Sequence, residues 1–313
     1  MDTLNIDWDY LLERIESLMD MGEEFLSRKL AEYEIDPEIF ESLVAFRWIR
    51  QNQSGFLGGV THPDIPDRKN LIGIDKSLTK LYQNTLQFVN HLPANNVLLW
   101  GERGCGKSSS VKSLLREFAP EGLRLIEVQK EDLFQLPEIT ARLRALDYRF
   151  ILFCDDLSFD ESEPGFRELK ALLEGGVEAR PGNVLVYATS NRRHLIPERF
   201  EENNGRAEIH PEETVSEKLS LSDRFGITLG FYPMTKATYL EIIRHHAKQR
   251  ELPIDEADLE TLAWQWSLER GGRSGRIARQ FIDDLTGCLA LEMAAHMAKE
   301  DSSSSGKLGT KNE

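Results

Sequence analysis

The chain has 313 residues, 40% of them hydrophobic and 9% aromatic, which is enough for one large or two moderate domains with buried cores. It carries 53 acidic and 38 basic residues, a formal net charge of -15 that disfavours nonspecific binding to nucleic acid or to anionic membranes. The three cysteines lie far apart and lack the paired spacing of zinc or redox sites. The sequence shows neither a basic and then apolar N-terminus nor an apolar run of membrane-spanning length, so we expect a cytoplasmic protein with no membrane partner.

Residues 1–69 are predicted to form an acidic helical region followed by a linker. Apolar residues recur at helical spacing in two stretches, first Leu11, Leu12, Ile15, Leu18 and Met19, and then Ile39, Leu43, Phe46 and Ile49. Such an amphipathic pair usually packs on its own domain, and docking of a partner is the alternative. The linker, Gln51–Lys69, is rich in Gly, Pro and Asp.

Residues 70–233 alternate short apolar runs with helical stretches. The runs predict buried strands at Val97–Trp100, Leu123–Val128, Phe150–Cys154, Val184–Ala188 and Ile227–Phe231. Helices are predicted in the intervals, as at Ser109–Phe118 and Phe166–Leu173. Strands that alternate with helices indicate a parallel α/β sheet. The polar stretch Arg192–Lys218 is expected to form a loop insertion near the carboxyl edge of the sheet.

Residues 234–298 contain no further strand pattern and are predicted to form a helical lid domain. Its three helices are expected at Lys236–Arg250, Asp255–Leu268 and Arg273–Met297, with Gly271 and Gly272 between the last two. The tail, residues 299–313, has four consecutive serines and few apolar residues, so we expect it to be disordered.

Gly101–Ser108 has the spacing of a phosphate-binding loop (P-loop), and it follows a predicted strand and opens a predicted helix. Glycine permits backbone conformations that turn N–H groups toward phosphates, and the helix N-terminus adds partial positive charge. Lys107 is expected to reach the β- and γ-phosphates and Ser108 to ligate Mg²⁺, so ATP and Mg²⁺ are the predicted cofactors. The other loop residues expected to contact the nucleotide are Gly101, Glu102, Arg103, Gly104, Cys105, Gly106 and Ser109.

Polar residues also follow two later strands. The run Phe150–Cys154 ends in Asp155, expected to hold Mg²⁺, and in Asp156, expected to orient and deprotonate the attacking water. Asp156 is one methylene shorter than the glutamate that more often fills this role. Asn191 follows the strand Val184–Ala188 and is expected to hold the attacking water between the two halves of the site.

Two arginines complete the candidate site. Arg224 lies just before the last strand and is expected to act in trans as an arginine finger, which predicts a homo-oligomer. Arg276 opens the last helix of the lid and is expected to contact the γ-phosphate. Either arginine alone would be assigned to a surface ion pair or a helix cap, and their order after a P-loop favours the functional interpretation.

This order of elements resembles the AAA+ superfamily. More narrowly, four blocks are similar to the mainly bacterial domain-of-unknown-function-815 family, namely Asn95–Gly101, Arg149–Ser158, Tyr187–Leu195 and Ser220–Gly226. The likeness runs from about Ala45 to Phe281. It implies a five-stranded parallel sheet of order 5-1-4-3-2 with a helical lid, to which the helical spacing described above adds N-terminal helices. It also implies nucleotide contacts by Ile72 and Gly73. It implies no substrate, and an aspartate at position 156 is shared with several DNA-loading AAA+ relatives.

Two functions remain open at this point. The first is an AAA+ ATPase that couples hydrolysis to conformational work on a protein or nucleic-acid partner. The second is a slow-turnover ATP-binding switch or adaptor that docks a partner through the acidic N-terminal helices. A GTPase would need an Asn-Lys-x-Asp motif, which the sequence lacks. Scattered basic residues usually form a solvated face rather than an edge for nucleic acid, as we expect for Lys130, Arg142, Arg144 and Arg149.

Overall fold

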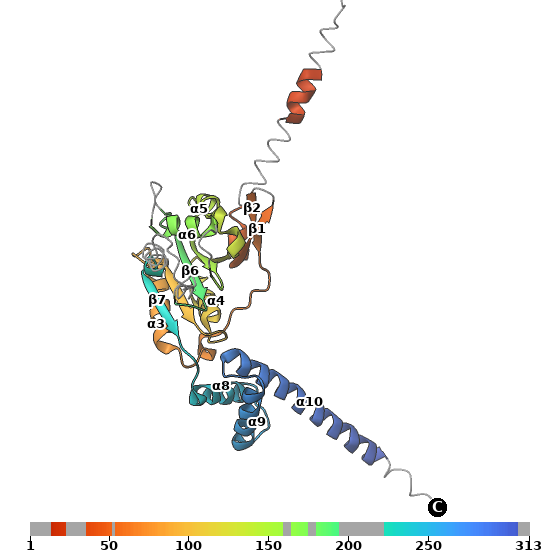
Figure 1. The fold of residues 1–313 in the computed structure, drawn as a ribbon. Helices are drawn as coiled ribbons and strands as arrows, with labels where there is room; N and C mark the ends of the chain where they lie inside the picture. The colour runs from red at the N-terminus through yellow and green to blue at the C-terminus, as the bar shows by residue number, and fades with distance from the viewer. Residues whose placement is uncertain are drawn as a thin grey trace, which may run out of the picture.

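The computed structural model describes residues 14–22, 36–51, 54–158, 164–174, 180–193 and 222–305. These form one mixed sheet with helices on both of its faces, followed by a helical C-terminal part (Figure 1). The strands are β1 (Ala45–Gln51), β2 (Ser54–Gly59), β3 (Val97–Gly101), β4 (Leu123–Glu127), β5 (Arg149–Cys154), β6 (Val184–Ser190) and β7 (Ile227–Phe231). The helices around the sheet are α2 (Ile39–Ser42), η1 (Arg68–Asn70), α3 (Asp75–Val89), α4 (Lys107–Phe118), η2 (Lys130–Gln135), α5 (Leu136–Leu143) and α6 (Pro164–Glu174), and those of the C-terminal part are α8 (Lys236–Gln249), α9 (Glu256–Glu269) and α10 (Gly275–Ser305).

The strand order is β2-β1-β4-β5-β6-β3-β7. The five predicted strands are β3 to β7, and their order is the expected 5-1-4-3-2, with every pair among them parallel. The predicted number of strands is wrong, because the described sheet has seven. β1 adds in parallel to β4, and β2 pairs with β1 in antiparallel orientation.

The two additional strands correct the predicted helical N-terminal region and linker. The helical spacing from Ile39 to Ile49 is broken at Ser42, where the short helix α2 ends. Beyond it, Phe46 and Trp48 point to the same buried side of β1, which is the two-residue period of a strand. A Cβ on Gly55 of β2 would lie 2.5 Å from the Trp48 ring, so the glycine of the presumed linker makes room for that ring. This pairing depends on tertiary contacts, which a local pattern does not record.

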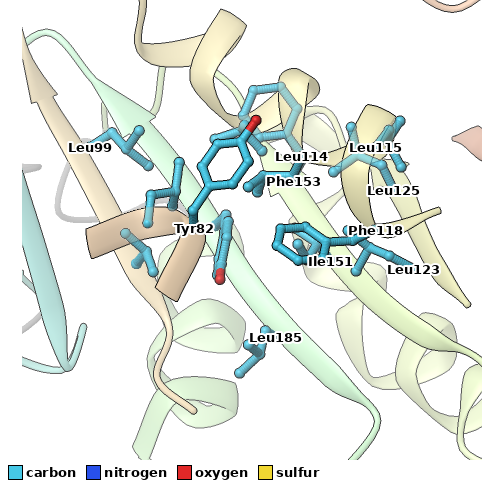
Figure 2. Packing of buried hydrophobic residues seen from close by; sticks show 14 of the residues in the cluster. Tyr82, Leu99, Leu114, Leu115, Phe118, Leu123, Leu125, Ile151, Phe153 and Leu185 are labelled. Atoms are coloured by element: carbon cyan, nitrogen blue, oxygen red, sulfur yellow. The ribbon is translucent and has the colours of Figure 1, made fainter. Parts of the chain in front are cut away.

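The sheet is apolar on both faces because helices cover both. One face packs against α3 and α4, and Figure 2 shows Tyr82 and Phe118 of these helices over Leu99, Ile151 and Leu185 of the sheet. The opposite face packs against η2, α5 and α6. Burial on both faces explains why the central strands are continuous apolar runs rather than alternating ones.

Helices α8, α9 and α10 lie in the region predicted as the lid, and the name lid is kept for them. They have a separate core that includes Tyr239, Ile243, Ala263 and Ile282. Ile72, from the segment before α3, packs against this core. In Figure 1 the lid lies at one end of the sheet and α10 extends away from it.

The C-terminal tail departs from its prediction. Helix α10 continues to Ser305, so the expected disorder from Lys299 is wrong up to that residue. Extending an existing helix adds one hydrogen bond for each residue fixed, so a long helix can carry serines that would not start one. Residues 306–313, and most of the expected loop insertion at Arg192–Lys218, lie outside the described residues.

Residues 14–22 form the described part of the predicted N-terminal helices, and Leu11 and Leu12 lie outside it. The side chains of Ile15, Leu18 and Met19 are 44%, 64% and 61% exposed. The expected packing of this apolar face on the chain's own domain is therefore absent from the described structure. None of the described helices has the length and apolar character needed to cross a membrane.

Candidate functional site

The P-loop connects β3 to α4 at the carboxyl edge of the sheet. Gly101, Gly104 and Gly106 have φ angles of 138°, 75° and 94°, in the region that favours glycine. A Cβ on Gly101 would lie 1.8 Å from the carbonyl oxygen of Phe231 in the neighbouring strand. The loop conformation therefore depends on glycine, and Gly106 caps the N-terminus of α4.

Lys107 is 7% exposed and bends back over the loop. Its Nζ donates to the carbonyl oxygens of Gly101 and Glu102, each at 2.7 Å, and to Asn191 Oδ1 at 3.2 Å. Burial lowers the pKa of Lys107 below its ordinary value, while nearby Cys105, Asp156 and Asp155 act in the opposite direction. An ammonium group held in this way is suited to an anionic ligand that replaces the neutral acceptors.

Two hydroxyls meet the carboxylate of Asp155. Ser108 Oγ donates to Asp155 Oδ1 at 2.6 Å, and Thr189 Oγ1 donates to the same oxygen at 2.5 Å. Hydroxyl and carboxylate oxygens are the hard donors that Mg²⁺ prefers. Among the described residues no group of three or more His, Cys, Asp and Glu could hold a metal ion. The donor set therefore fits Mg²⁺ that takes its remaining ligands from phosphates and water, as this ion usually does.

Asp156 adjoins this metal-type donor set. Its φ angle is 53°, an uncommon value for a residue other than glycine. Its carboxylate accepts a hydrogen bond from Asn191 Nδ2 and lies 3.7 Å from the Arg103 guanidinium. Because Asn191 also accepts from Lys107, one amide side chain links the P-loop to the acidic end of β5.

A cleft of about 800 Å³ lies between this edge of the sheet and the lid. The predicted residues that line it are Ile72, Arg103, Gly104, Cys105, Gly106, Lys107, Ser108, Ser109, Asp155, Asp156, Asn191 and Arg276. Gly101 and Glu102 support the site through the carbonyls that hold Lys107. A Cβ on Gly73 would lie 2.4 Å from Thr238 Cγ2, so this glycine permits close packing on α8 rather than lining the cleft.

The P-loop contacts the lid at Gly104. A Cβ there would lie 2.8 Å from Ser274 Oγ and 3.3 Å from Arg276 Cβ. Ser274 Oγ accepts a hydrogen bond from the backbone N–H of Ile277 at 3.2 Å, in the first turn of α10. The loop and the first turn of α10, which carries Arg276, are therefore in van der Waals contact.

Arg224 does not reach the cleft described here. Its side chain is 20% exposed and pairs with Glu174 at the end of α6, through both Nε and Nη2. Among the described residues, Arg224 is therefore separated from the other predicted site residues of its own chain.

Several cleft residues were missed in the sequence. Asn70 Oδ1 accepts from Gln249 Nε2 at 2.8 Å and lies 3.0 Å from His245 Nε2, which joins η1 to α8. His246 also lines the cleft, and burial lowers its pKa. His246, Gln249 and Arg250 have the three- and four-residue spacing of one helix face, but the sequence alone does not show what that face meets. Thr189 also lines the cleft, but as one residue of the strand β6 it has no motif that would identify it in the sequence.

Comparison with solved structures gives similarity to the Holliday junction branch migration motor RuvB of Thermotoga maritima. The TM-score is 0.52 at 20% identity, over 72% of this chain and 66% of that chain. Two variants of that protein give TM-scores of 0.52 and 0.51 at 20% and 19% identity. At such identities the likeness shows a shared fold, here the AAA+ P-loop fold.

No protein with a curated description matches the chain. Residues 41–289 match the family described as "Protein of unknown function (DUF815)", and this match covers most of the chain. The matched range includes both strands that the sequence pattern missed, the whole cleft and most of the lid. The chain has the AAA+ P-loop fold and belongs to the DUF815 family.

Proposed function

We propose that this protein is a Mg²⁺-dependent AAA+ ATPase that couples ATP hydrolysis to conformational work on a protein or nucleic-acid partner. The observation that carries the proposal is the cleft of about 800 Å³ that the P-loop, the acidic end of β5 and the lid residue Arg276 line together. Its volume is within the range of pockets that bury a ligand of nucleotide size.

Each group in the cleft has a distinct role in this proposal. The loop N–H groups and Lys107 bind the phosphates, with Lys107 exchanging its carbonyl acceptors for phosphate oxygens. Ser108 and Asp155 hold Mg²⁺, which when bound neutralises charge on the phosphates. Asp156 accepts a proton from the attacking water, and Asn191, bonded to its carboxylate, holds that water in place. Arg276 binds the terminal phosphate from the lid.

The division of the cleft between two bodies provides the link to movement. The P-loop belongs to the sheet domain and Arg276 to the lid, and they touch at Gly104. A triphosphate that contacts both sides favours one lid position, and a diphosphate without the terminal phosphate favours it less. Hydrolysis therefore changes the preferred angle between sheet domain and lid.

Arg224 completes the proposal through a second subunit. Within its own chain it is paired with Glu174 and apart from the cleft, which supports a role on a neighbour's nucleotide. A head-to-tail homo-oligomer places the same arginine at every interface. The similar Thermotoga protein is a motor for branch migration of Holliday junctions. For this chain the partner is left as a protein or a nucleic acid.

A slow-turnover switch is the second candidate, and two observations favour it. The short side chain of Asp156 is occupied by Asn191 and faced by Arg103, which leaves it less free to accept a proton. The helix of residues 14–22 exposes Leu18 and Met19, an apolar face of the kind that docks a partner. In this function ATP binding, rather than its turnover, controls the docking.

The first experiment measures binding of a fluorescent ATP analogue and ATP turnover over a range of protein concentrations, with and without Mg²⁺. We expect Lys107→Ala to abolish both, because it removes the buried ammonium group. Lys80→Ala, which removes an exposed lysine of α3, is the control and should leave both unchanged. Normal nucleotide affinity in Lys107→Ala would refute both candidate functions. Tight binding with negligible turnover at every concentration would favour the switch.

The second experiment tests the arginine in trans by mixing two inactive variants. Lys107→Ala keeps Arg224 but loses its own site, and Arg224→Ala keeps its own site but loses the arginine that it offers to a neighbour. In an equal mixture about a quarter of all interfaces combine an intact site with an intact arginine. Turnover should therefore recover to about a quarter of the wild-type rate. No recovery, from proteins shown to associate, would exclude the role in trans.

A further inference from the structure

Thr189 is a buried polar residue that touches both acidic residues of the cleft. It lies at the carboxyl end of β6, beside the end of β5, and is 1% exposed. Its hydroxyl donates to Asp155 Oδ1 at 2.5 Å and accepts from the backbone N–H of Asp156 at 2.8 Å. One hydroxyl therefore uses its proton on the first aspartate and a lone pair on the second.

The backbone of Thr189 adds a third contact to the same turn. Its carbonyl oxygen accepts from the N–H of Leu157 at 2.7 Å. Three consecutive residues of the turn, Asp155 to Leu157, are thus each bonded to the single residue Thr189. These three bonds fix where the turn lies relative to β6.

The turn needs such fixing because Asp156 is held in the left-handed region, at a φ angle of 53°. That conformation is uncommon for a residue other than glycine, although aspartate adopts it more readily than most, and it persists where surrounding contacts determine it. The bond from the Asp156 N–H to Thr189 is one of these contacts, and it directs the Asp156 carboxylate toward Asn191.

We propose that Thr189 is a positioning residue whose hydroxyl orients the metal-binding carboxylate of Asp155 and the backbone of Asp156 for Mg²⁺-nucleotide binding and turnover. This inference rests on the proposed function. The side chain is suited to the role, because the β-branched methyl restricts the rotation that aims the hydroxyl. Valine has the same shape without the hydroxyl, and serine has the hydroxyl without the methyl.

The experiment compares nucleotide binding by Thr189→Val, Thr189→Ser and wild type, with no Mg²⁺ and over a titration of Mg²⁺. Removing a hydrogen-bond partner of a metal ligand typically weakens metal binding about 10- to 100-fold. We therefore expect Thr189→Val to raise the half-saturating Mg²⁺ concentration by that factor, while Mg²⁺-free affinity stays within about 2-fold of wild type. Thr189→Ser should restore most of the Mg²⁺ affinity because it retains the hydroxyl.

Thr85→Val is the matched control. Thr85 is also a fully buried threonine, and its hydroxyl donates a hydrogen bond to the carbonyl oxygen of Leu81. It also forms a hydrogen bond with the hydroxyl of Tyr187, which lies on β6 together with Thr189. The two valine variants make the same chemical change, but only one lies at the aspartates. Thr85→Val should lower thermal stability and leave the Mg²⁺ titration unchanged.

A wild-type Mg²⁺ titration in Thr189→Val would overturn the inference, and so would equal shifts in Thr189→Val and Thr85→Val. Should Thr189→Val not fold, Thr189→Ala removes the same hydroxyl and serves the same comparison. Failure of the proposed function has a different outcome, because wild type would then bind no nucleotide or Lys107→Ala would bind it normally.

Discussion

Replacing Gly104 with alanine tests the contact that joins the P-loop to the lid. Gly104 has a φ angle of 75°, and its missing Cβ would lie 2.8 Å from Ser274 Oγ and 3.0 Å from Ser274 Cβ. Ser274 in turn accepts the N–H of Ile277 at the start of α10. A methyl group at position 104 therefore strains its own backbone and also presses on the residue that caps α10.

The two effects have separable magnitudes. An alanine in the left-handed region costs about 1–2 kcal/mol. Displacing a serine cap costs about 1 kcal/mol more. Gly122→Ala is the matched control, because Gly122 has a φ angle of 87° with nothing within 4 Å of the added Cβ. We expect Gly104→Ala to unfold about 2–4 °C below Gly122→Ala, which corresponds to about 1 kcal/mol in a domain of this size.

Nucleotide affinity separates the variants more clearly than stability does. Pushing on Ser274 moves the first turn of α10, and with it Arg276. Losing a hydrogen bond to a charged group costs about 1.5–3 kcal/mol, so Gly104→Ala should bind ATP about 10- to 100-fold more weakly. Gly122→Ala should bind it as wild type does. Titration with a fluorescent ATP analogue measures both, and equal affinities in the two alanine variants would refute the coupling between loop and lid.

Three further outcomes are expected. Glu174→Gln should lower the protein concentration at which turnover is half-maximal, because Arg224 then has no ion pair to break before it reaches a neighbouring subunit. An unchanged half-maximal concentration would contradict this. Burial lowers the pKa of His246 below the ordinary 6.5, so below that pH the unfolded chain binds more protons and stability falls. In chemical denaturation His246→Gln should therefore lose less stability than wild type between about pH 7.5 and 5.5, and equal losses would exclude the effect. Burial raises the pKa of the Cys105 thiol, so iodoacetamide should label the exposed Cys288 before Cys105. Mass spectrometry measures the order of labelling, and labelling of Cys105 before Cys288 would contradict the buried position of Cys105 in the loop.

Much of the sheet could be predicted because its central strands are short apolar runs with their own boundaries. The run Phe150–Cys154 is buried on both faces whichever helices cover it, so its sequence identifies it as a parallel strand. The strand β1 could not be found in this way. Ala45–Gln51 carries charged residues and lies between β2 and β4, and its partner β2 has a glycine, Gly55, where Trp48 packs. Whether such a segment is a helix, a linker or a hairpin depends on what it meets.

The candidate site, like the sheet, has parts that the sequence predicts and parts that depend on tertiary contacts. The sequence by itself determined the P-loop, because its glycines, Lys107 and Ser108 act through local backbone geometry and helix position. It also determined that Asp155 follows a buried strand and so lies at the edge where the loop is.

Only the tertiary structure decided which of these groups touch one another. Thr189 and Asp155 are 34 residues apart in sequence and bond through neighbouring strands, and Asn70 and Gln249 are 179 residues apart and bond between the sheet domain and the lid. Hydrogen bonds have a range of about 3 Å, so they depend on final atomic positions rather than on residue type or spacing. The sequence thus specified a phosphate-binding loop with acidic and basic partners, and the fold specified which hydroxyl, amide and lid residue hold them in place.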